Sequence, residues 1–495
     1  MRRAFVLFAL SGAISLLAAG GQNVSVERLD GSTITPAEID ATVTQVMRGA
    51  EVPGAAVALF NDVKVAYLKT YGVRDKDNNL PLTPDSVMTA ASWSKVAFAY
   101  MVMQLVEEGT LDLEKPVSEY LPKPLPEYSN YADLAGDARY QKITARMLLD
   151  HSSGFPNWRW ANDNRKLNIN FEPGARFAYS GEGIDLLQLV VETITRTPLE
   201  ELMQKRVFQP LGMTRTSMIW QSRFDADYAN GYDEYGRSLG PEKRKTADAA
   251  GSMLTTPADF ARFMQAVMQE RAPDGHGLLS HKTRELMLAP QIQINSKHEF
   301  PSLDTETTDQ NKAIRLSYAL AWGLYWTPYG KAFFKEGHDE GWRNYAVCFD
   351  EKKIGMFIMT NSSNGEGTYQ ELLEMLLKNP YTPIEWEGFT PYDKLPLRPP
   401  LKQHKVIVVD PEVLEGYVGR YGLPPNIVLT ITRSGDHLAV QENDEPAQQL
   451  LAEGPRAFFS EMADDAYTFE VDAQGRATVM TLHTGGQDIP IKRLP

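Results

Sequence analysis

The sequence predicts an α+β domain, in which helices and a helical subdomain flank an antiparallel sheet, followed by a small antiparallel β-barrel. Three observations predict this class. Strand patterns stand at both ends of residues 34–379 with helical patterns between them, so both ends are expected to join one sheet. Residues 380–410 are rich in proline, which is typical of a stiff, extended connector. Residues 411–495 hold short alternating segments separated by Gly, Asn and Asp turns, as small barrels do.

The first domain is expected to be built from two strand pairs and the helices between them. Residues 53–60 and 63–70 form the first pair, joined around Asn61 and Asp62, which is a hairpin signal. The second pair, residues 345–349 and 354–360, is separated by a charged turn. Helices are expected at residues 95–108, 183–195, 199–207 and 257–269. In the barrel, strands are expected at residues 427–432, 437–441, 458–462, 467–471 and 477–482.

Composition excludes several classes of function. The 50 Lys and Arg residues against 64 Asp and Glu residues give a net charge of −14, which repels a polyanion, so we expect no nucleic-acid partner. Cys348 is the single cysteine of the sequence, so neither an intramolecular disulfide nor a cysteine-rich zinc site can form. The histidines show no metal-ligand spacing, and phosphate-binding and α/β-hydrolase patterns lack their structural context. We therefore expect no metal and no cofactor.

The N-terminus is typical of an exported protein. Arg2 and Arg3 precede an apolar run over residues 4–17 and a stretch of small residues, which predicts a signal peptide over residues 1–21. The run is too short for a comfortable membrane span, although an uncleaved anchor is the alternative. We expect a periplasmic or secreted protein with no membrane span after cleavage.

Residues 92–103 (SWSKVAFAYMVM) carry the strongest local signal for chemistry. A helix that is apolar on nearly every face is buried, and Ser92 and Lys95 lie three residues apart, on one face of it. Burial would strip water from the Lys95 ammonium and lower its pKa, so that the neutral amine could accept the Ser92 proton. The alternative is that Ser92 or Ser94 only caps the helix while Lys95 reaches solvent.

Three further segments follow in order along the chain. They are residues 143–156 (ITARMLLDHSSGFP), 171–180 (FEPGARFAYS) and 210–217 (PLGMTRTS). Together with Ser92 and Lys95 they resemble the serine β-lactamase and penicillin-binding-protein superfamily, and within it the class C β-lactamase-related serine hydrolases. The resemblance extends over residues 51–379. It implies a β-lactamase-like fold, and the last domain resembles the lipocalin-like barrels attached to some relatives.

The resemblance also implies roles for individual residues. Ser92 would be the acylated nucleophile, Lys95 its base, and Tyr179 the tyrosine that moves a proton to and from the leaving group. A lysine ammonium near Tyr179 would stabilise its phenolate. Gly181 stands where the family usually has an asparagine that contacts a substrate amide, and this difference disfavours strong penicillin recognition.

The third family motif, Lys-Thr-Gly or His-x-Gly, is expected on an edge strand within residues 333–342 (FFKEGHDEGW). We match His338 to its first residue, which puts Glu340 in the glycine position and Gly341 one place late, so that a bulge is required. His338, Glu340, Gly341 and Gly181 are thus the expected substrate-binding residues. Backbone N–H groups of Ser92 and of a residue within 339–341 would form the oxyanion hole.

These observations favour an exported serine hydrolase that cleaves amide or ester bonds through an acyl-enzyme on Ser92. Small esters, D-amino-acid peptides or amides, and β-lactams are candidate substrates, so the expected partner is a small molecule or a short peptide. The alternative is a penicillin-binding or peptidoglycan-sensing module that is acylated with little turnover. The barrel could cover the cleft, hold a ligand or join copies of the chain into a homo-oligomer.

Overall fold

The computed structural model describes residues 25–495 apart from 163, 270–277, 399, 401–403, 424–426, 444–446, 461–464 and 485–486. The expected signal peptide at residues 1–21 therefore lies outside the described residues. Within the described part of the chain, no helix has the length and apolar character that crossing a membrane requires.

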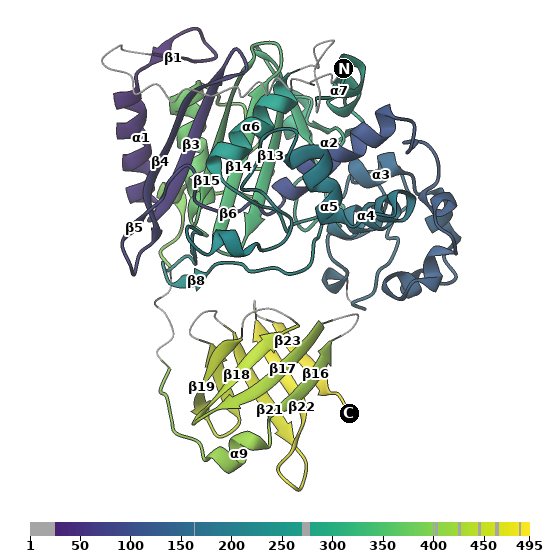
Figure 1. Ribbon diagram of the computed structural model, residues 1–495, viewed down its shortest axis with the longest axis vertical. Helices are drawn as coiled ribbons and strands as arrows, with labels where there is room; N and C mark the ends of the chain where they lie inside the picture. Colours follow the sequence, from purple (N-terminus) through teal and green to yellow (C-terminus); the bar gives the residue numbers. More distant parts are fainter. Residues whose placement is uncertain are drawn as a thin grey trace, which may run out of the picture.

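A nine-stranded sheet forms the centre of the first domain, in the order β10-β11-β12-β13-β14-β15-β3-β4-β5 (Figure 1). Its strands are β10 (Ile292–Gln293), β11 (Ser317–Tyr318), β12 (Gly323–Thr327), β13 (Gly330–Asp339), β14 (Trp342–Phe349), β15 (Ile354–Thr360), β3 (Gly54–Asn61), β4 (Lys64–Asp75) and β5 (Leu80–Pro81). The late strand β15 pairs antiparallel with the early strand β3. The expectation that both ends of the domain join one sheet is confirmed.

Strand β3 shows why the sheet has a helical layer on each face. Ala55, Val57 and Leu59 pack in one apolar cluster, while the alternate residues Ala56, Ala58 and Phe60 pack in another, because successive side chains point to opposite faces. Helices α1 (Pro36–Gly49) and α8 (Tyr369–Leu372) supply the first cluster. Helices α2 (Trp93–Glu107) and α6 (Pro257–Met268) supply the second. The α+β class predicted from the sequence is confirmed.

The first hairpin turns one residue later than the sequence indicated. Asp62 and Val63 have φ of 47° and 67°, so these two residues, rather than Asn61 and Asp62, form the tight connection between β3 and β4. Positive φ at both central residues suits the right-handed twist of paired strands. The second turn lies where the sequence placed it, between Phe349 and Ile354.

A helical subdomain lies to one side of the sheet, with α3, α4 and α5 side by side (Figure 1). Helices α3 (Ala145–Leu149), α4 (Gly181–Thr195), α5 (Leu199–Met203) and α7 (His281–Met287) complete this domain. The helix expected over residues 199–207 is α-helical only as far as Met203, because residues Gln204–Phe208 form a π turn. Short strand pairs add β1 (Val26–Glu27) with β2 (Thr33–Ile34), β6 (Met88–Thr89) with β9 (Leu254–Thr255), and β7 (Gly231–Tyr232) with β8 (Ser238–Gly240).

The first part of the expected connector belongs to the core of the first domain. Ile384, Trp386 and Phe389 are buried in the same cluster as α1, whereas Leu397 is fully exposed. Burial of these large apolar side chains stabilises the packing of residues 380–389 against the domain, although the segment contains prolines. Tyr392 also packs against this cluster, so the exposed connector begins after residue 392.

The C-terminal strands close into an eight-stranded barrel, as expected, because β23 pairs with β16 (Figure 1). Its strands are β16 (Gly419–Leu423), β17 (Ile427–Ser434), β18 (His437–Glu442), β19 (Gln448–Gly454), β20 (Ala457–Ser460), β21 (Ala466–Val471), β22 (Ala477–Thr484) and β23 (Gln487–Arg493). Helix α9 (Pro411–Glu415) precedes them. Alternate side chains fill the interior with an apolar core of its own.

Candidate active site

Ser92 stands at the first turn of the buried helix α2, and Lys95 lies one turn further along. The Lys95 Nζ lies 3.1 Å from Ser92 Oγ and donates to the Ala250 carbonyl at 2.6 Å. Ser92 makes no side-chain capping bond, and Lys95 is only 1% exposed, so the capping and solvent-reaching alternatives do not describe these residues. The preceding residue, Ala91, has φ of 50°, a strained backbone that orients the serine.

The surroundings of Lys95 favour its neutral form. Burial, followed by the charge of the nearby Lys335, lowers the Lys95 pKa from 10.5 to about 8. The carboxylates of Asp248 and Glu336 act in the opposite direction and keep the pKa from falling further. An amine with this pKa, in contact with a hydroxyl group, can act as a general base near neutral pH.

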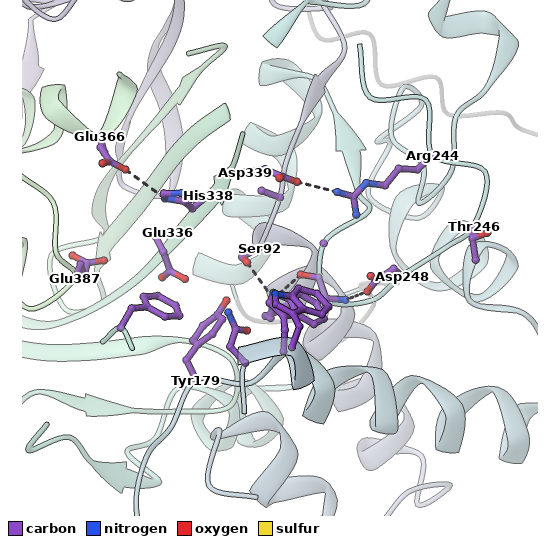
Figure 2. A pocket seen from close by; sticks show the side chains of 18 of the residues that line it. Ser92, Tyr179, Arg244, Thr246, Asp248, Glu336, His338, Asp339, Glu366 and Glu387 are labelled. Carbon is purple, nitrogen blue, oxygen red and sulfur yellow. Dashed lines mark hydrogen bonds and ion pairs between the residues drawn. The ribbon is translucent and has the colours of Figure 1, made fainter. Parts of the chain in front are cut away.

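Tyr179 joins Ser92 and Lys95 in the same pocket (Figure 2). The Lys95 Nζ lies over its ring, 5.0 Å from the ring centroid. The expectation of a stabilised phenolate is not met, because burial and the Glu336 carboxylate raise the Tyr179 pKa well above 10. Tyr179 is thus a neutral phenol, and His151, with ring centroids 4.4 Å apart, packs against it.

Strand β13 runs past the serine turn and brings a second lysine to the site. Lys335 is fully buried, and its Nζ contacts Tyr179 Oη at 3.0 Å and the Glu336 carboxylate. A Cβ added at Gly337 would lie 2.6 Å from the Ala90 carbonyl oxygen, so this position needs glycine for the strand to approach the turn.

The expected match of the third motif to His338 is corrected by this strand. The β13–β14 register runs from Ala332 to Asp339 without a bulge, so the irregularity that the match required is absent. Lys335, Glu336 and Gly337 fit Lys-Thr-Gly without any insertion. The signal was present in the sequence, but it was missed because the only histidine of the segment was preferred.

Of the four expected substrate-binding residues, His338 alone is among the described residues that line the pocket. His338 lines the pocket, with a side chain 52% exposed and Nδ1 3.4 Å from a Glu366 carboxylate oxygen. Among the described residues that line the pocket, Gly181, Glu340 and Gly341 do not occur. The amides of Glu340 and Gly341 donate to the Asp339 carboxylate and the Ser363 hydroxyl, which disfavours them as oxyanion donors.

Two neighbouring residues, Asn157 and Trp158, occupy the space around Gly181. A Cβ at Gly181 would lie 2.5 Å from the Trp158 ring, so no larger residue fits there. The Asn157 side-chain oxygen accepts from the Gly181 amide at 3.0 Å, and both Asn157 and Trp158 line the pocket. A carboxamide therefore stands beside this position although the motif itself has none.

The pocket is a cavity of about 1170 Å³ that extends well beyond Ser92. Cationic groups line one side, with Arg244 held by Asp339 at 3.0 Å (Figure 2). Glu336 and Glu387 line another side, and their carboxylates lie within 4.8 Å of that of Glu299, an arrangement able to hold a cation. No pattern in the sequence indicated this cluster.

The barrel also contributes to the cavity wall. Ile427, Glu442 and Asn443, from the end of the barrel that bears the start of β17 and the end of β18, line the same pocket. Side chains of the barrel thus border the cavity that contains Ser92, and the covering role considered from the sequence stays a prediction.

A family model described as Beta-lactamase matches residues 39–377. The chain belongs to the beta-lactamase family. A second family model, described as a domain of unknown function (DUF3471), matches residues 403–493, which include the barrel.

Similar proteins occur in several bacteria and in an archaeon. The beta-lactamase family member is 25% identical over 434 residues to Penicillin-binding protein 4* of Bacillus subtilis, covering 80% of this chain and 85% of that one. It is 26% identical over 266 residues to Protein flp of Staphylococcus aureus, covering 50% of this chain, and it spans about half (51%) of that relative's length.

Solved structures share the fold. The octameric penicillin-binding protein homologue from Pyrococcus abyssi matches with a TM-score of 0.56 and 22% identity, over 92% of this chain and 99% of that chain. The D-alanine carboxypeptidase AmpC from Burkholderia cenocepacia matches with a TM-score of 0.54 and 22% identity, over 68% and 97%. The recognition of the superfamily and its fold from the sequence is confirmed.

Proposed function

We propose that this protein is an exported serine hydrolase that cleaves ester or amide bonds through an acyl-enzyme on Ser92. One observation carries the proposal: the dehydrated Lys95 amine lies 3.1 Å from the Ser92 hydroxyl, with its pKa lowered to about 8. A neutral lysine at this distance turns a weak nucleophile into a reactive one.

The reaction would proceed in two halves. Ser92 Oγ attacks the substrate carbonyl while its proton passes to Lys95, and the carbonyl electrons move onto oxygen to give a tetrahedral oxyanion. Tyr179 relays the proton held by Lys95 to the leaving alcohol or amine as the carbon–heteroatom bond breaks, which returns Lys95 to its neutral form. Water then attacks the acyl-serine and gives one proton to Lys95, and that proton passes to Ser92 Oγ as the acyl–oxygen bond breaks and the acid is released. The Ser92 amide and, in place of the expected donor within residues 339–341, an amide of β13 near Gly337 would bind the oxyanion.

The substrates proposed are small esters, D-amino-acid peptides or amides, and β-lactams, with the last disfavoured by Gly181. The named activity of the Burkholderia relative, a D-alanine carboxypeptidase, supports a peptide substrate. Export would deliver the enzyme to the periplasm or outside the cell. The octameric state of the Pyrococcus homologue supports a homo-oligomer.

The test compares wild type with Ser92→Ala and Lys95→Ala on a nitrophenyl ester, a D-alanyl dipeptide and a chromogenic lactam. Ser92→Ala should abolish turnover and Lys95→Ala should nearly do so, whereas Ser129→Ala, at an exposed serine, serves as the matched control. Wild-type rates in Ser92→Ala would overturn the assignment.

The alternative is a penicillin-binding module that is acylated but turns over slowly. The similarity to Penicillin-binding protein 4* favours it. A fluorescent penicillin distinguishes the two: a persistent adduct on Ser92 indicates the binding module, and rapid loss of the adduct indicates the hydrolase.

A further inference from the structure

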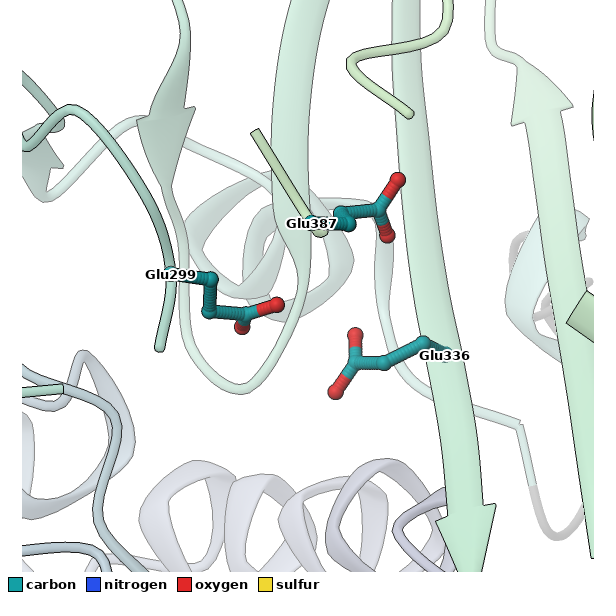
Figure 3. Close-up of side chains that lie close together, drawn as sticks. All are labelled: Glu299, Glu336 and Glu387. Carbon is teal, nitrogen blue, oxygen red and sulfur yellow. The ribbon is translucent and has the colours of Figure 1, made fainter. Parts of the chain in front are cut away.

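Three buried glutamates that the acyl-transfer chemistry does not use lie together, and two of them, Glu336 and Glu387, line the cavity. Figure 3 shows the carboxyl groups of Glu299, Glu336 and Glu387 converging, with Glu336 on β13 and the other two on loops. One oxygen of each lies within 4.8 Å of the others. The two loops are joined by a hydrogen bond from the Glu299 amide to the Trp386 carbonyl at 2.9 Å.

Two neighbouring side chains already pair with glutamates of this cluster. Lys335 contacts the Glu336 carboxylate, and the Tyr345 hydroxyl donates to Glu387 Oε2 at 3.0 Å. Glu299 Oε1 and Glu387 Oε1 are buried without a hydrogen-bond partner in the described part of the chain, on side chains belonging to residues 2% and 4% exposed. Leaving such atoms unpaired costs free energy, so a ligand that donates to them is favoured.

The cluster can be reached from the catalytic serine. Glu336 and Glu387 line the same cavity as Ser92, and the rings of Phe300 and Phe389 line it beside them. Two unpaired acceptor oxygens next to a cavity with aromatic rings in its wall suit an organic ammonium group, which has up to three N–H donors and an apolar stem. Ca²⁺ and Mg²⁺ take six or more oxygen ligands, whereas among the described residues of this cluster only Glu299 Oε1 and Glu387 Oε1 lack a hydrogen-bond partner, so water would have to supply most of the shell.

We infer that Glu299, Glu336 and Glu387 form a subsite for a protonated primary amine of the substrate, so that the enzyme selects amine-bearing esters or amides. This inference rests on the proposed function and names its substrate class. Burial and the neighbouring carboxylates raise the pKa of Glu299 and of Glu387 well above their ordinary values, as expected where a counter-cation is lacking.

The experiment measures the ratio of kcat/KM for D-alanine p-nitroanilide to that for its N-acetyl form. Wild type should prefer the free amine by at least tenfold. Glu387→Gln, which keeps the shape but removes the charge, should lower this ratio at least tenfold, and Glu299→Gln should lower it in the same direction. The matched control is Glu385→Gln, at an exposed glutamate of the same loop, which should leave the ratio unchanged.

A second measurement does not depend on turnover. Benzylamine should slow the labelling of Ser92 by a neutral fluorophosphonate in wild type more than benzyl alcohol does, and Glu387→Gln should remove that difference. Labelling of both variants by the probe alone shows that they are folded.

Three results would overturn the inference. The first is that wild type shows no preference for the free amine. The second is an unchanged kcat/KM ratio in both glutamine variants, together with equal protection by benzylamine and benzyl alcohol. The third is calcium binding to wild type that Glu387→Gln removes. The last would identify a metal site. Failure of the proposed function gives a different result, namely hydrolysis that persists in Ser92→Ala.

Discussion

The pH dependence of acylation tests the role of Lys95 most directly. If neutral Lys95 accepts the Ser92 proton, the acylation rate follows the neutral fraction of an amine whose pKa is about 8. That fraction is about one-tenth at pH 7 and about nine-tenths at pH 9, so the rate should rise about tenfold between them. For a lysine with an ordinary pKa, the neutral fraction at pH 7 would be roughly 300-fold smaller, a difference of about 3 kcal/mol.

Two substitutions should move the midpoint of this profile in opposite directions. Lys335→Met removes a positive charge that lowers the Lys95 pKa, so the midpoint should rise. Asp248→Asn removes a negative charge that raises it, so the midpoint should fall. The assay is single-turnover acylation of Ser92 by a neutral nitrophenyl ester, followed from about pH 6 to about pH 10. A rate that is flat from pH 7 to pH 9, or midpoints that move in the same direction in both variants, would refute the reasoning.

Three further substitutions have defined outcomes. Gly337→Ala should lower kcat/KM by about 100-fold with an unchanged circular dichroism spectrum, because its Cβ would lie 2.6 Å from the Ala90 carbonyl oxygen and displace β13; near-normal activity would contradict this. Gly181→Asn should lower the melting temperature and gain no nitrocefin hydrolysis, because the neighbouring indole fills the space; faster lactam turnover would count against it. Asp350→Asn should cost about 3 kcal/mol in urea unfolding, because it leaves the buried Arg284 guanidinium with the half-exposed Glu285 as its remaining carboxylate partner. Burial raises the Asp350 pKa, but the Arg284 guanidinium holds it well below 3.8. The stabilisation from this ion pair is therefore present above pH 3.8 and is lost as the pH falls below 3.8. Equal acid sensitivity in wild type and Asp350→Asn would refute this explanation.

The amino-acid pattern was sufficient for most of the fold. Residues 53–60 and 354–360 were predicted as hairpin strands from opposite ends of the domain, and the two strands pair inside one sheet. Helix α1 was missed, although Thr35, Pro36 and Glu38 form a capping box with proline at the start of the helix. The prolines of residues 380–389 predicted a connector. Proline content, however, does not indicate which surface the intervening aromatic side chains pack against.

The sequence by itself determined which groups could react: Ser92 and Lys95 share one helical face, and an apolar helix must be buried, so the amine was expected to lose its water. Only the tertiary structure decided which residues meet that pair. Lys335 rather than His338 faces Tyr179, because the unbroken pairing of β13 fixes which side chains point to the serine. Glu299, Glu336 and Glu387 converge because loops distant in the chain pack together, and such contacts leave no periodic signal in the sequence.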